Sequence, residues 1–333
     1  MKVLILGGTQ FLGRHLVETA LDLGYEVTIF NRGKSNTDIY PEVEKLVGDR
    51  EKRELDTLKG REWDCVIDTI GFLETLDHAV KDSVELLKDK TEYYSFISSI
   101  SAYSEVKPNF DESTPTLIDV EKTPENYYGV NKARAEKFVT DAFGTQGLNV
   151  RAGLIVGKYE MSNRLTYWIK RIKHGGEVLA PVDPEYPLQL IDALDISRWI
   201  FKMIAKNEGG DFNVTGPDYA LTLGYLFSNC KDIIQSDADF TWVSNEFLQD
   251  NNVGEWRELP FWTTDQQLLI MTSSCNINKA IKSGLEFRPI EETISDVFDW
   301  LKVAPGNYEY KFAKGLDPKK EKMLLQKWKE ESD

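Results

Sequence analysis

The amino-terminal stretch K-V-L-I-L-G-G-T-Q-F-L-G-R-H-L-V-E-T-A-L-D-L-G, residues 2–24, decides the fold. It begins with a predicted strand at Lys2–Leu6, which contains the apolar run from Val3 to Leu6, passes through two glycines and continues with a helical pattern that ends at Gly24. A strand that leads through a glycine turn into a helix can bind a dinucleotide, because the free N–H groups and positive dipole of the helix N-terminus face the pyrophosphate. We therefore expect a phosphate-binding turn at residues 7–13.

This turn departs from the usual glycine pattern in one place. Gly7 and Gly13 occupy the first and third places of G-x-x-G-x-x-G, and Gln10 stands in the middle place. The Gln10 side chain must turn aside or contact the phosphate itself. The alternative is a glycine turn that serves only packing. The predicted cofactor contacts of the turn are Gly7, Thr9, Gln10, Phe11, Leu12 and Gly13.

Strands and helices alternate through the first half of the chain. Further strands are expected at Glu26–Phe30, Val43–Val47, Asp64–Asp68, Tyr93–Ile97 and Asn149–Ile155. Helices are expected at Phe11–Leu23, Glu74–Leu87 and, with Thr123 as N-cap and Pro124 as first helical residue, up to Phe143. The alternation implies right-handed βαβ units and a doubly wound parallel sheet covered on both faces.

The rhythm changes after Gly157 and becomes mostly helical after Pro217. We expect residues 1–156 and 189–215 to form the dinucleotide-binding core. Residues 157–188 and 216–333 are expected to form a smaller, mainly helical substrate lobe, with a lysine-rich surface helix near the end of the chain.

Composition excludes several classes of protein. Of 333 residues, 41% are hydrophobic and 29% charged, and the net charge of −15 opposes partners that carry phosphate backbones. The three cysteines and three histidines are scattered, and no stretch approaches the length of a membrane span. We expect a cytoplasmic protein with no metal, no membrane contact and no nucleic-acid partner.

The end of the second strand bears on cofactor choice. A carboxylate there would bind the ribose hydroxyls of NAD, but the chain has Asn31, Arg32 and Lys34, which suit a 2′-phosphate and favour NADP, with NAD as the alternative. The two cations can equally be solvated loop charges. The other predicted cofactor contacts follow later strands, where ordinary loop chemistry is the alternative: Asp49, Arg50, Thr69, Gly71 and Ser98.

A serine, a tyrosine and a lysine form the predicted catalytic set. Ser99 ends the fifth strand, and Tyr128 precedes Lys132 by one helical turn, so the last two share a face. A neighbouring ammonium lowers the pKa of a phenol, which can then exchange a proton with a substrate oxygen. Ser99 can hydrogen-bond that oxygen. The alternative is a tyrosine and a lysine that only pack on the helix.

These motifs carry a resemblance to a known family. With G-G-T-Q-F-L-G-R, F-N-R-G, G-D-R, F-I-S-S-I-S-A-Y, Y-G-V-N-K and Q-L-I-D-A-L-D, the chain resembles the extended and atypical short-chain dehydrogenase/reductases, specifically the NAD-dependent epimerase/dehydratase group. The resemblance implies a Rossmann core, a homodimer formed through the helices at about 74–87 and 124–143, and a nicotinamide ribose held by Lys132.

Departures from the family narrow the chemistry. Sugar 4,6-dehydratases carry an acidic pair after the catalytic hydroxyl residue, where this chain has Ile100 and Ser101. Leu154 replaces the asparagine with which nucleotide-sugar epimerases hold the diphosphate, and Lys158 replaces a proline. We therefore expect an NADP-preferring epimerase or dehydrogenase/reductase that transfers hydride at a carbinol carbon of a sugar-like or other small hydroxylated substrate.

Two other functions and two substrate contacts complete the hypothesis. The large middle residue of the glycine turn also resembles the plant chloroplast stem-loop RNA-binding branch, so RNA binding is the first alternative, and a non-catalytic dinucleotide sensor is the second. The net charge and the lack of a basic-aromatic stripe before the last thirty residues weigh against RNA binding.

Arg164 and Gln189 are candidate substrate contacts, and a salt-bridged helix cation is the alternative for Arg164.

Overall fold

The computed structural model describes residues 1–71, 73–304, 308 and 310–332, and it divides the chain into two compact units. Unit 1 comprises Met1–Ile155, Ala193–Gly216 and Cys275–Glu286. Unit 2 comprises Val156–Asp192, Pro217–Ser274 and Phe287–Asp333. The sequence predicts residues 275–286 in the lobe and residues 189–192 in the core, whereas the structure groups the first with unit 1 and the second with unit 2. Residues 275–286 join unit 1 because Asn276 N–H donates to Phe110 O at 2.8 Å and Trp199 Nε1 donates to Ser283 Oγ at 2.9 Å.

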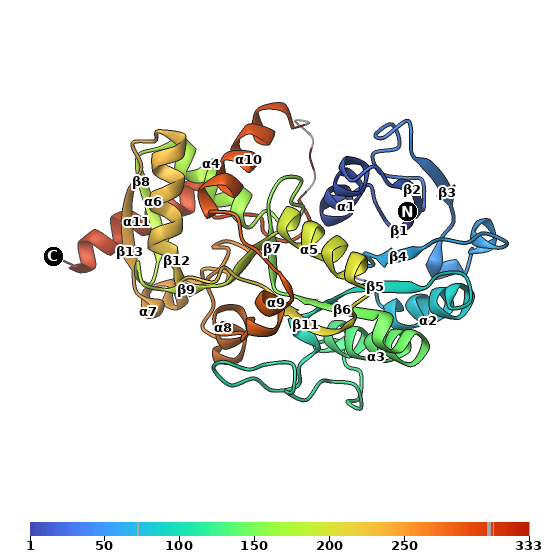
Figure 1. The fold of residues 1–333 in the computed structure, drawn as a ribbon. Coiled ribbons are helices and arrows are strands. Elements are labelled where there is room, and N and C mark those ends of the chain that lie inside the picture. Colours follow the sequence, from blue (N-terminus) through green and yellow to red (C-terminus); the bar gives the residue numbers. More distant parts are fainter. Residues whose placement is uncertain (72, 305–307, 309, 333) are drawn as a thin grey trace. The chain divides into compact units, whose positions relative to one another are not determined.

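Unit 1 is built on a parallel sheet of seven strands among the described residues, in the order β11-β6-β5-β4-β1-β2-β3 (Figure 1). The strands are β1 (Lys2–Leu6), β2 (Glu26–Asn31), β3 (Glu44–Val47), β4 (Cys65–Asp68), β5 (Tyr93–Ser99), β6 (Gly147–Ala152) and β11 (Gly210–Val214). From the neighbouring strands β1 and β4 the chain winds outward in opposite directions. The doubly wound Rossmann fold is thereby confirmed, and such a sheet opens its crevice at the carboxyl ends of those two strands.

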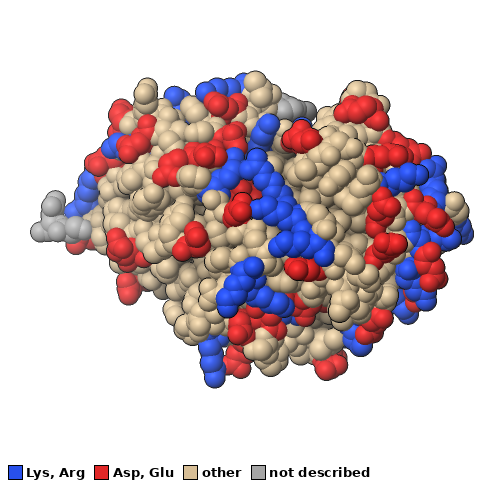
Figure 2. All heavy atoms as spheres, in the orientation of Figure 1, with Lys and Arg blue, Asp and Glu red and all other residues tan. Residues whose placement is uncertain are grey.

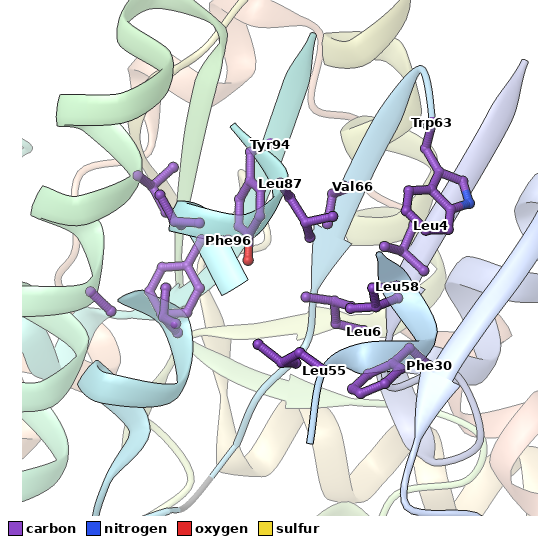
Figure 3. Packing of buried hydrophobic residues seen from close by; sticks show 14 of the residues in the cluster. Leu4, Leu6, Phe30, Leu55, Leu58, Trp63, Val66, Leu87, Tyr94 and Phe96 are labelled. Carbon is purple, nitrogen blue, oxygen red and sulfur yellow. The ribbon is translucent and has the colours of Figure 1, made fainter. Parts of the chain in front are cut away.

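Helices cover both faces of this sheet, which is why its strands are apolar on both sides (Figure 1). The helices α1 (Phe11–Asp22) and α5 (Ala193–Lys206) pack together on one face, and α2 (Leu76–Leu87) and α3 (Tyr127–Phe143) pack together on the other. Figure 3 shows the core beneath α2 and α3, where Leu4, Val66, Tyr94 and Phe96 meet from three strands.

Two elements of unit 1 differ from the sequence expectation. The helix expected from Thr123 begins at Tyr127, because Asn126 accepts the Thr123 N–H at 2.7 Å and donates to Glu121 O at 3.0 Å, which closes a turn ahead of the helix. The sixth strand is divided at Gly153 into β6 and a short β7 (Leu154–Val156).

Unit 2 combines short strands with helices. Its strands are β8 (Glu177–Pro181), β9 (Pro187–Leu188), β10 (Leu190–Asp192), β12 (Leu221–Thr222) and β13 (Asp239–Val243), of which β8 and β13 pair in parallel and β9 and β12 antiparallel. Its helices are α4 (Leu165–His174), α6 (Leu223–Ile234), α7 (Asn245–Asp250), α8 (Gln266–Ser273), α10 (Ile290–Val303) and α11 (Pro318–Ser332). The remaining helix, α9 (Asn278–Ser283), belongs to unit 1.

The carboxyl-terminal helix α11 is held by a buried ion pair. Arg171 Nε donates to both oxygens of Glu321, at 2.9 and 2.7 Å, and the same carboxylate accepts the Leu179 N–H at 3.1 Å. Leu324 and Leu325 are buried on the apolar face of α11, as expected for the lysine-rich terminal helix. Within the described ranges, no helix has both the length and the apolar character that crossing a membrane requires.

Candidate cofactor and catalytic site

The glycine turn follows β1, at the sheet edge where the crevice of unit 1 is expected. Gly7 has φ +128°, a conformation that L side chains rarely adopt, and a Cβ at this position would lie 2.1 Å from Thr69 Oγ1. A Cβ on Gly13 would lie 2.7 Å from Gly8 N. Glycine at both places lets the backbone approach closely and leaves a cradle that a side chain would fill.

The first turn of α1 suits an anion. No acidic residue stands in that turn, so the positive end of the helix is not opposed by a local carboxylate. Gln10 is the N-cap residue, and its side chain makes no capping bond. Phe11 starts the helix at φ +36° and contacts His15 edge to face. An unopposed helix N-terminus of this kind would suit the pyrophosphate of a dinucleotide.

The loop after β2 is bonded to the glycine turn. The Asn31 amide donates to Gly7 O at 3.1 Å and accepts the Gly33 N–H at 2.8 Å, and Asn36 donates to Thr9 O at 2.7 Å. Arg32 is 57% exposed and lies 3.7 Å from Glu51, and Lys34 is exposed. Asn31 therefore fixes the turn, whereas Arg32 and Lys34 remain on the surface where a phosphate can reach them.

The two polar residues predicted after β3 have internal partners. Asp49 accepts the Glu51 N–H at 3.1 Å and so caps a short 3₁₀ turn, Arg50–Lys52. Both terminal nitrogens of Arg50 donate to Asp68, each at 2.7 Å. Since the guanidinium points into the core, ion pairing with Asp68 is better supported for Arg50 than the cofactor contact expected from the sequence.

The turn after β4 faces the glycine turn across the two central strands. Thr69 donates through Oγ1 to Leu6 O at 2.9 Å, and its N–H bonds the same oxygen at 3.1 Å. Gly71 has open space where a Cβ would stand. Thr69 thus joins the carboxyl ends of β4 and β1 and lies close to Gly7. The cofactor contacts of Thr69 and Gly71 stay predictions.

Two serines end β5, and they point to different partners. Ser98 donates to Glu136, which also accepts from Arg151 Nη2 at 2.8 Å, and all three side chains are buried. Burial raises the pKa of Glu136, although Arg151 opposes that rise. Ser99 Oγ accepts the Ser101 N–H at 3.1 Å. A hydroxyl that accepts one bond can still donate its own hydrogen, so Ser99 keeps a donor for a substrate oxygen.

Tyr128 and Lys132 come together on α3. The Lys132 Nζ lies 5.6 Å from the centre of the Tyr128 ring and 4.7 Å from that of Phe96. It donates to the carbonyl oxygens of Ile97 at 2.6 Å and Ile70 at 2.8 Å. An ammonium has three hydrogens, so these two carbonyls leave one for a ribose hydroxyl or the phenol.

Lys132 is among the most buried side chains of the chain, with 1% of its surface exposed. Removal from water disfavours the charged form and lowers the pKa of Lys132 to about 7, while the negative charges of Asp68 and Glu136 oppose the decrease. The ammonium beside the predicted catalytic phenol therefore changes charge near neutral pH.

The two candidate substrate contacts lie in unit 2. Arg164 precedes α4, and its Nε donates to Ser162 Oγ at 2.9 Å and lies 3.8 Å from the buried Glu160. Gln189 stands between β9 and β10, where its N–H donates to Thr272 O at 2.8 Å. The bonds of Arg164 agree with the alternative of a salt-bridged cation, and the substrate role of both residues stays a prediction.

Sequence reasoning missed the two buried carboxylates beneath the site, Asp68 and Glu136. A usable signal existed for Asp68, because it ends the otherwise apolar run C-V-I-D. Glu136 follows Lys132 by one helical turn and gave no such signal. In the described residues, no group of three or more His, Cys, Asp or Glu side chains could hold a metal ion.

Comparison with known proteins was made on sequence and on structure. The model of the NAD dependent epimerase/dehydratase family matches residues 3–215. A chloroplast stem-loop binding protein of 41 kDa from Arabidopsis thaliana is 24% identical over 238 residues, which are 66% of this chain and 59% of the relative. UDP-glucose 4-epimerase from Neisseria gonorrhoeae is 27% identical over 166 residues, which are 42% of this chain and 48% of that protein. The chain thus spans less than two thirds of either curated relative.

Solved structures with the same fold match more of the chain. UDP-glucose 4-epimerase from Thermotoga maritima, solved with UDP-glucose, has a TM-score of 0.71 at 17% identity and covers 91% of this chain and 99% of its own. UDP-N-acetylglucosamine 4-epimerase from Methanobrevibacter ruminantium has a TM-score of 0.70 at 18% identity, over 91% and 98%. UDP-glucose 4-epimerase from Thermus thermophilus, solved with NAD, has a TM-score of 0.67 at 16% identity, over 92% and 100%. At such identities these likenesses show the fold alone.

Proposed function

Since the chain belongs to the NAD dependent epimerase/dehydratase family, we propose that it is an NAD(P)-dependent enzyme that acts at a carbinol carbon of a sugar-like or other small hydroxylated substrate. One observation carries the proposal: Lys132 is held by two backbone carbonyls so that its Nζ lies 5.6 Å from the centre of the Tyr128 ring. A buried lysine in this place serves a chemical purpose better than it serves stability, because burial disfavours its charge.

Each member of the proposed catalytic set has a distinct task. A bound nicotinamide dinucleotide would accept and return the hydride. Tyr128, as a phenolate, takes the hydroxyl proton of the substrate when the carbinol is oxidised and returns it in the reverse direction. Lys132 stabilises the phenolate through its charge, and Ser99 donates a hydrogen bond to the same substrate oxygen.

The site favours some outcomes over others. Re-reduction of the oxidised carbon from its other face gives epimerisation, and release of the reduced cofactor gives dehydrogenation. Elimination of water of the 4,6-dehydratase type is disfavoured, because Ile100 and Ser101 follow Ser99 where an acidic pair would be needed. The UDP-sugar epimerases of the same fold support a sugar-like substrate.

NADP is the preferred cofactor in this proposal. Arg32 and Lys34 are exposed beyond the end of β2, and Asn31 stands there in place of a carboxylate. Titration with NADP and with NAD, followed by intrinsic tryptophan fluorescence, should give tighter binding of NADP. Arg32→Ala should remove this difference in affinity. Arg61→Ala is the control and should keep the difference, because Arg61 is also exposed and pairs with Glu44. Tighter binding of NAD would contradict the phosphate argument, and NAD would then be the cofactor.

Catalysis is tested at Tyr128. Tyr128→Phe should abolish turnover of sugar-nucleotide and polyol substrates while it leaves cofactor affinity nearly unchanged, because only the exchangeable proton is lost. Tyr127→Phe, on the neighbouring residue, is the matched control and should keep turnover. Equal turnover by the wild type and Tyr128→Phe would remove Tyr128 from the mechanism.

The proposed homodimer would bury charged side chains on the exposed sides of α2 and α3. The exposed sides of α2 and α3 carry the ion pairs Lys81–Glu85 at 3.7 Å and Lys137–Asp141 at 2.8 Å. Sedimentation at increasing salt should therefore show whether these helices associate, and a mass of one chain at every salt concentration would contradict the dimer.

RNA binding is a second candidate, favoured by the Arabidopsis relative and by one surface. Figure 2 shows basic side chains over α5 and α9, where the helices carry Arg198, Lys202, Lys206, Lys279 and Lys282. The three on α5 stand four residues apart and so share one face. The sequence alone does not predict this surface, because the basic residues of α5 and those of α9 are about 80 residues apart along the chain.

The surface makes the RNA hypothesis testable. Lys202 and Lys206 already donate to the carbonyls of Gly284 and Ser283 at the end of α9, at 3.4 and 2.7 Å, which accounts for them without RNA. If RNA binds here, Lys202→Glu with Lys206→Glu should weaken retention of a hairpin RNA at moderate salt, whereas Lys319→Glu with Lys322→Glu on α11 should not. Equal retention by both double variants would exclude this surface.

A further inference from the structure

Asp68 is a buried charge that the proposed catalytic cycle does not use directly. It ends β4 beside the turn at residues 69–71, and none of its surface is exposed. Its carboxylate accepts from Arg50 Nη1 and Nη2, each at 2.7 Å, from the Tyr94 hydroxyl at 2.8 Å and from the Ile70 N–H at 3.1 Å. Four donors therefore hold the Asp68 carboxylate in one position.

A short chain of bonds connects this carboxylate to Lys132. The Ile70 N–H donates to Asp68, and the Ile70 carbonyl accepts from Lys132 Nζ at 2.8 Å. Asp68 also pairs with Phe96 in the sheet register, and Lys132 Nζ lies 4.7 Å from the centre of that ring. The residue that Asp68 orients is therefore the one that holds the lysine.

The charges around Lys132 act in different directions. Burial lowers the pKa of Lys132, the negative charge of Asp68 is the strongest opposing influence, and Glu136 on α3 adds to it. Arg50 acts in the same direction as burial. Tyr128 presents its ring, so the only charge that it can place near the ammonium is its own phenolate.

We propose that Asp68 is a positioning residue for Lys132: its carboxylate fixes the Ile70 turn on which the ammonium is held and keeps that ammonium charged beside Tyr128. The catalytic meaning of this role rests on the proposed function, but the effect on Lys132 does not. Arg50 is part of the same arrangement, because it fixes the carboxylate and moderates its negative charge.

The charge state of Lys132 can be followed without cofactor or substrate. In protein labelled with ¹³C at lysine Cε, the Cε shift reports protonation, and the Lys132 signal is the one that Lys132→Met lacks. The wild type should show one lysine that titrates near neutral pH. Asp68→Asn should move that midpoint to lower pH by about one unit, the low end of what a nearby opposite charge contributes. Arg50→Gln should move it to higher pH.

Asp68→Asn and Arg50→Gln break the same ion pair, and both weaken the fold. Opposite shifts of the Lys132 midpoint in the two variants therefore reflect the charges near the lysine and not a loss of stability. Tyr94→Phe is the matched control: it removes a bond to Asp68 without removing a charge, and the midpoint should stay within a few tenths of a unit. Where Asp68→Asn does not fold, Asp68→Asn with Arg50→Gln keeps a neutral amide pair in the same volume and should give a smaller downward shift.

Two results would overturn the proposal: a midpoint that Asp68→Asn leaves unchanged, or shifts of the same sign in Asp68→Asn and Arg50→Gln. The proposed function fails separately, through equal turnover by the wild type and Tyr128→Phe. Opposite shifts in a protein that turns over no substrate would support the role of Asp68 and contradict the enzyme.

Discussion

Replacing Lys132 by methionine should change how the stability of unit 1 depends on pH. Methionine fills about the same space as the lysine stem but carries no charge and no donor. The carbonyls of Ile70 and Ile97 then lose their partner, a cost of about 1–3 kcal/mol each that does not vary with pH. The slope of the stability difference against pH, rather than its size at one pH, therefore reports the buried charge.

The expected slope follows from the two pKa values of the lysine. In the folded chain the pKa of Lys132 is about 7, against an ordinary value of 10.5. Between these values the unfolded chain binds a proton that the folded chain lacks, so the wild type gains about 1.4 kcal/mol of unfolding free energy per pH unit as pH rises. Below the folded pKa both states are protonated and this contribution is flat. Because half of the folded lysines are still protonated at pH 7, the unfolding free energy of the wild type should rise by about 2 kcal/mol relative to that of Lys132→Met between about pH 7 and about pH 9.

Urea titrations of both proteins at several pH values, followed by circular dichroism, measure this difference. The m values should agree between the proteins, which shows that the same transition is compared. Lys137→Met is the matched control, because Lys137 lies on the same helix, is exposed and pairs with Asp141 at 2.8 Å. A difference between wild type and Lys132→Met that stays constant from about pH 6 to about pH 9 would refute a neutral-range pKa for this lysine.

Three further results are expected. Gly7→Ala should lose NADP affinity at least tenfold by equilibrium titration, because the added Cβ meets Thr69 Oγ1. Gly60→Ala is the control, since Gly60 also has a positive φ but open space around it, and it should bind NADP as the wild type does. Equal NADP affinity of the wild type and both variants would contradict a phosphate-binding role of the turn at residues 7–13. Glu321→Gln should cost about 3 kcal/mol in urea unfolding, the low end for breaking a buried pair, because it leaves the partly buried Arg171 without its carboxylate. Glu331→Gln on the exposed side of α11 should cost less than about 0.5 kcal/mol, and a loss below about 1 kcal/mol for Glu321→Gln would contradict the pair. All three cysteine thiols are buried, and burial raises their pKa values, so a thiol reagent at neutral pH should react only after unfolding; rapid reaction of the native protein would contradict their placement.

The parts of the site that follow from sequence are those whose physics is local. Gly7 and Gly13 lie within one turn, and the spacing of Tyr128 and Lys132 is one turn of helix, so chain geometry alone brings each pair together. The core strands were recognisable because a parallel sheet buried on both faces needs continuous apolar runs, such as Lys2–Leu6. The family match and the doubly wound sheet confirm the fold that these patterns predicted.

The remaining features depend on partners that are distant in sequence. Arg50 has the sequence position of a cofactor contact because it follows a strand end, whereas its bond to Asp68, 18 residues further along the chain, is visible only in the folded structure. The bond between Ser98 and Glu136 joins residues 38 positions apart. The return of residues 275–286 to unit 1 depends in the same way on Phe110 and Trp199, which no local pattern links to them.

The hydrogen bond from the Asn31 amide to Gly7 O has a practical consequence for anyone who wants to exchange the coenzyme. Converting Asn31 to an acid is the obvious substitution to favour NAD binding, but a carboxylate cannot donate to Gly7 O. The substitution would therefore loosen the turn that is predicted to bind the phosphates. Redesign should begin at Arg32 and Lys34, whose side chains can change without disturbing that anchor. If the proposed cofactor contacts hold, the residues that select the coenzyme are neighbours of the residue that anchors the turn, and only the former can be substituted without loss of the Gly7 bond.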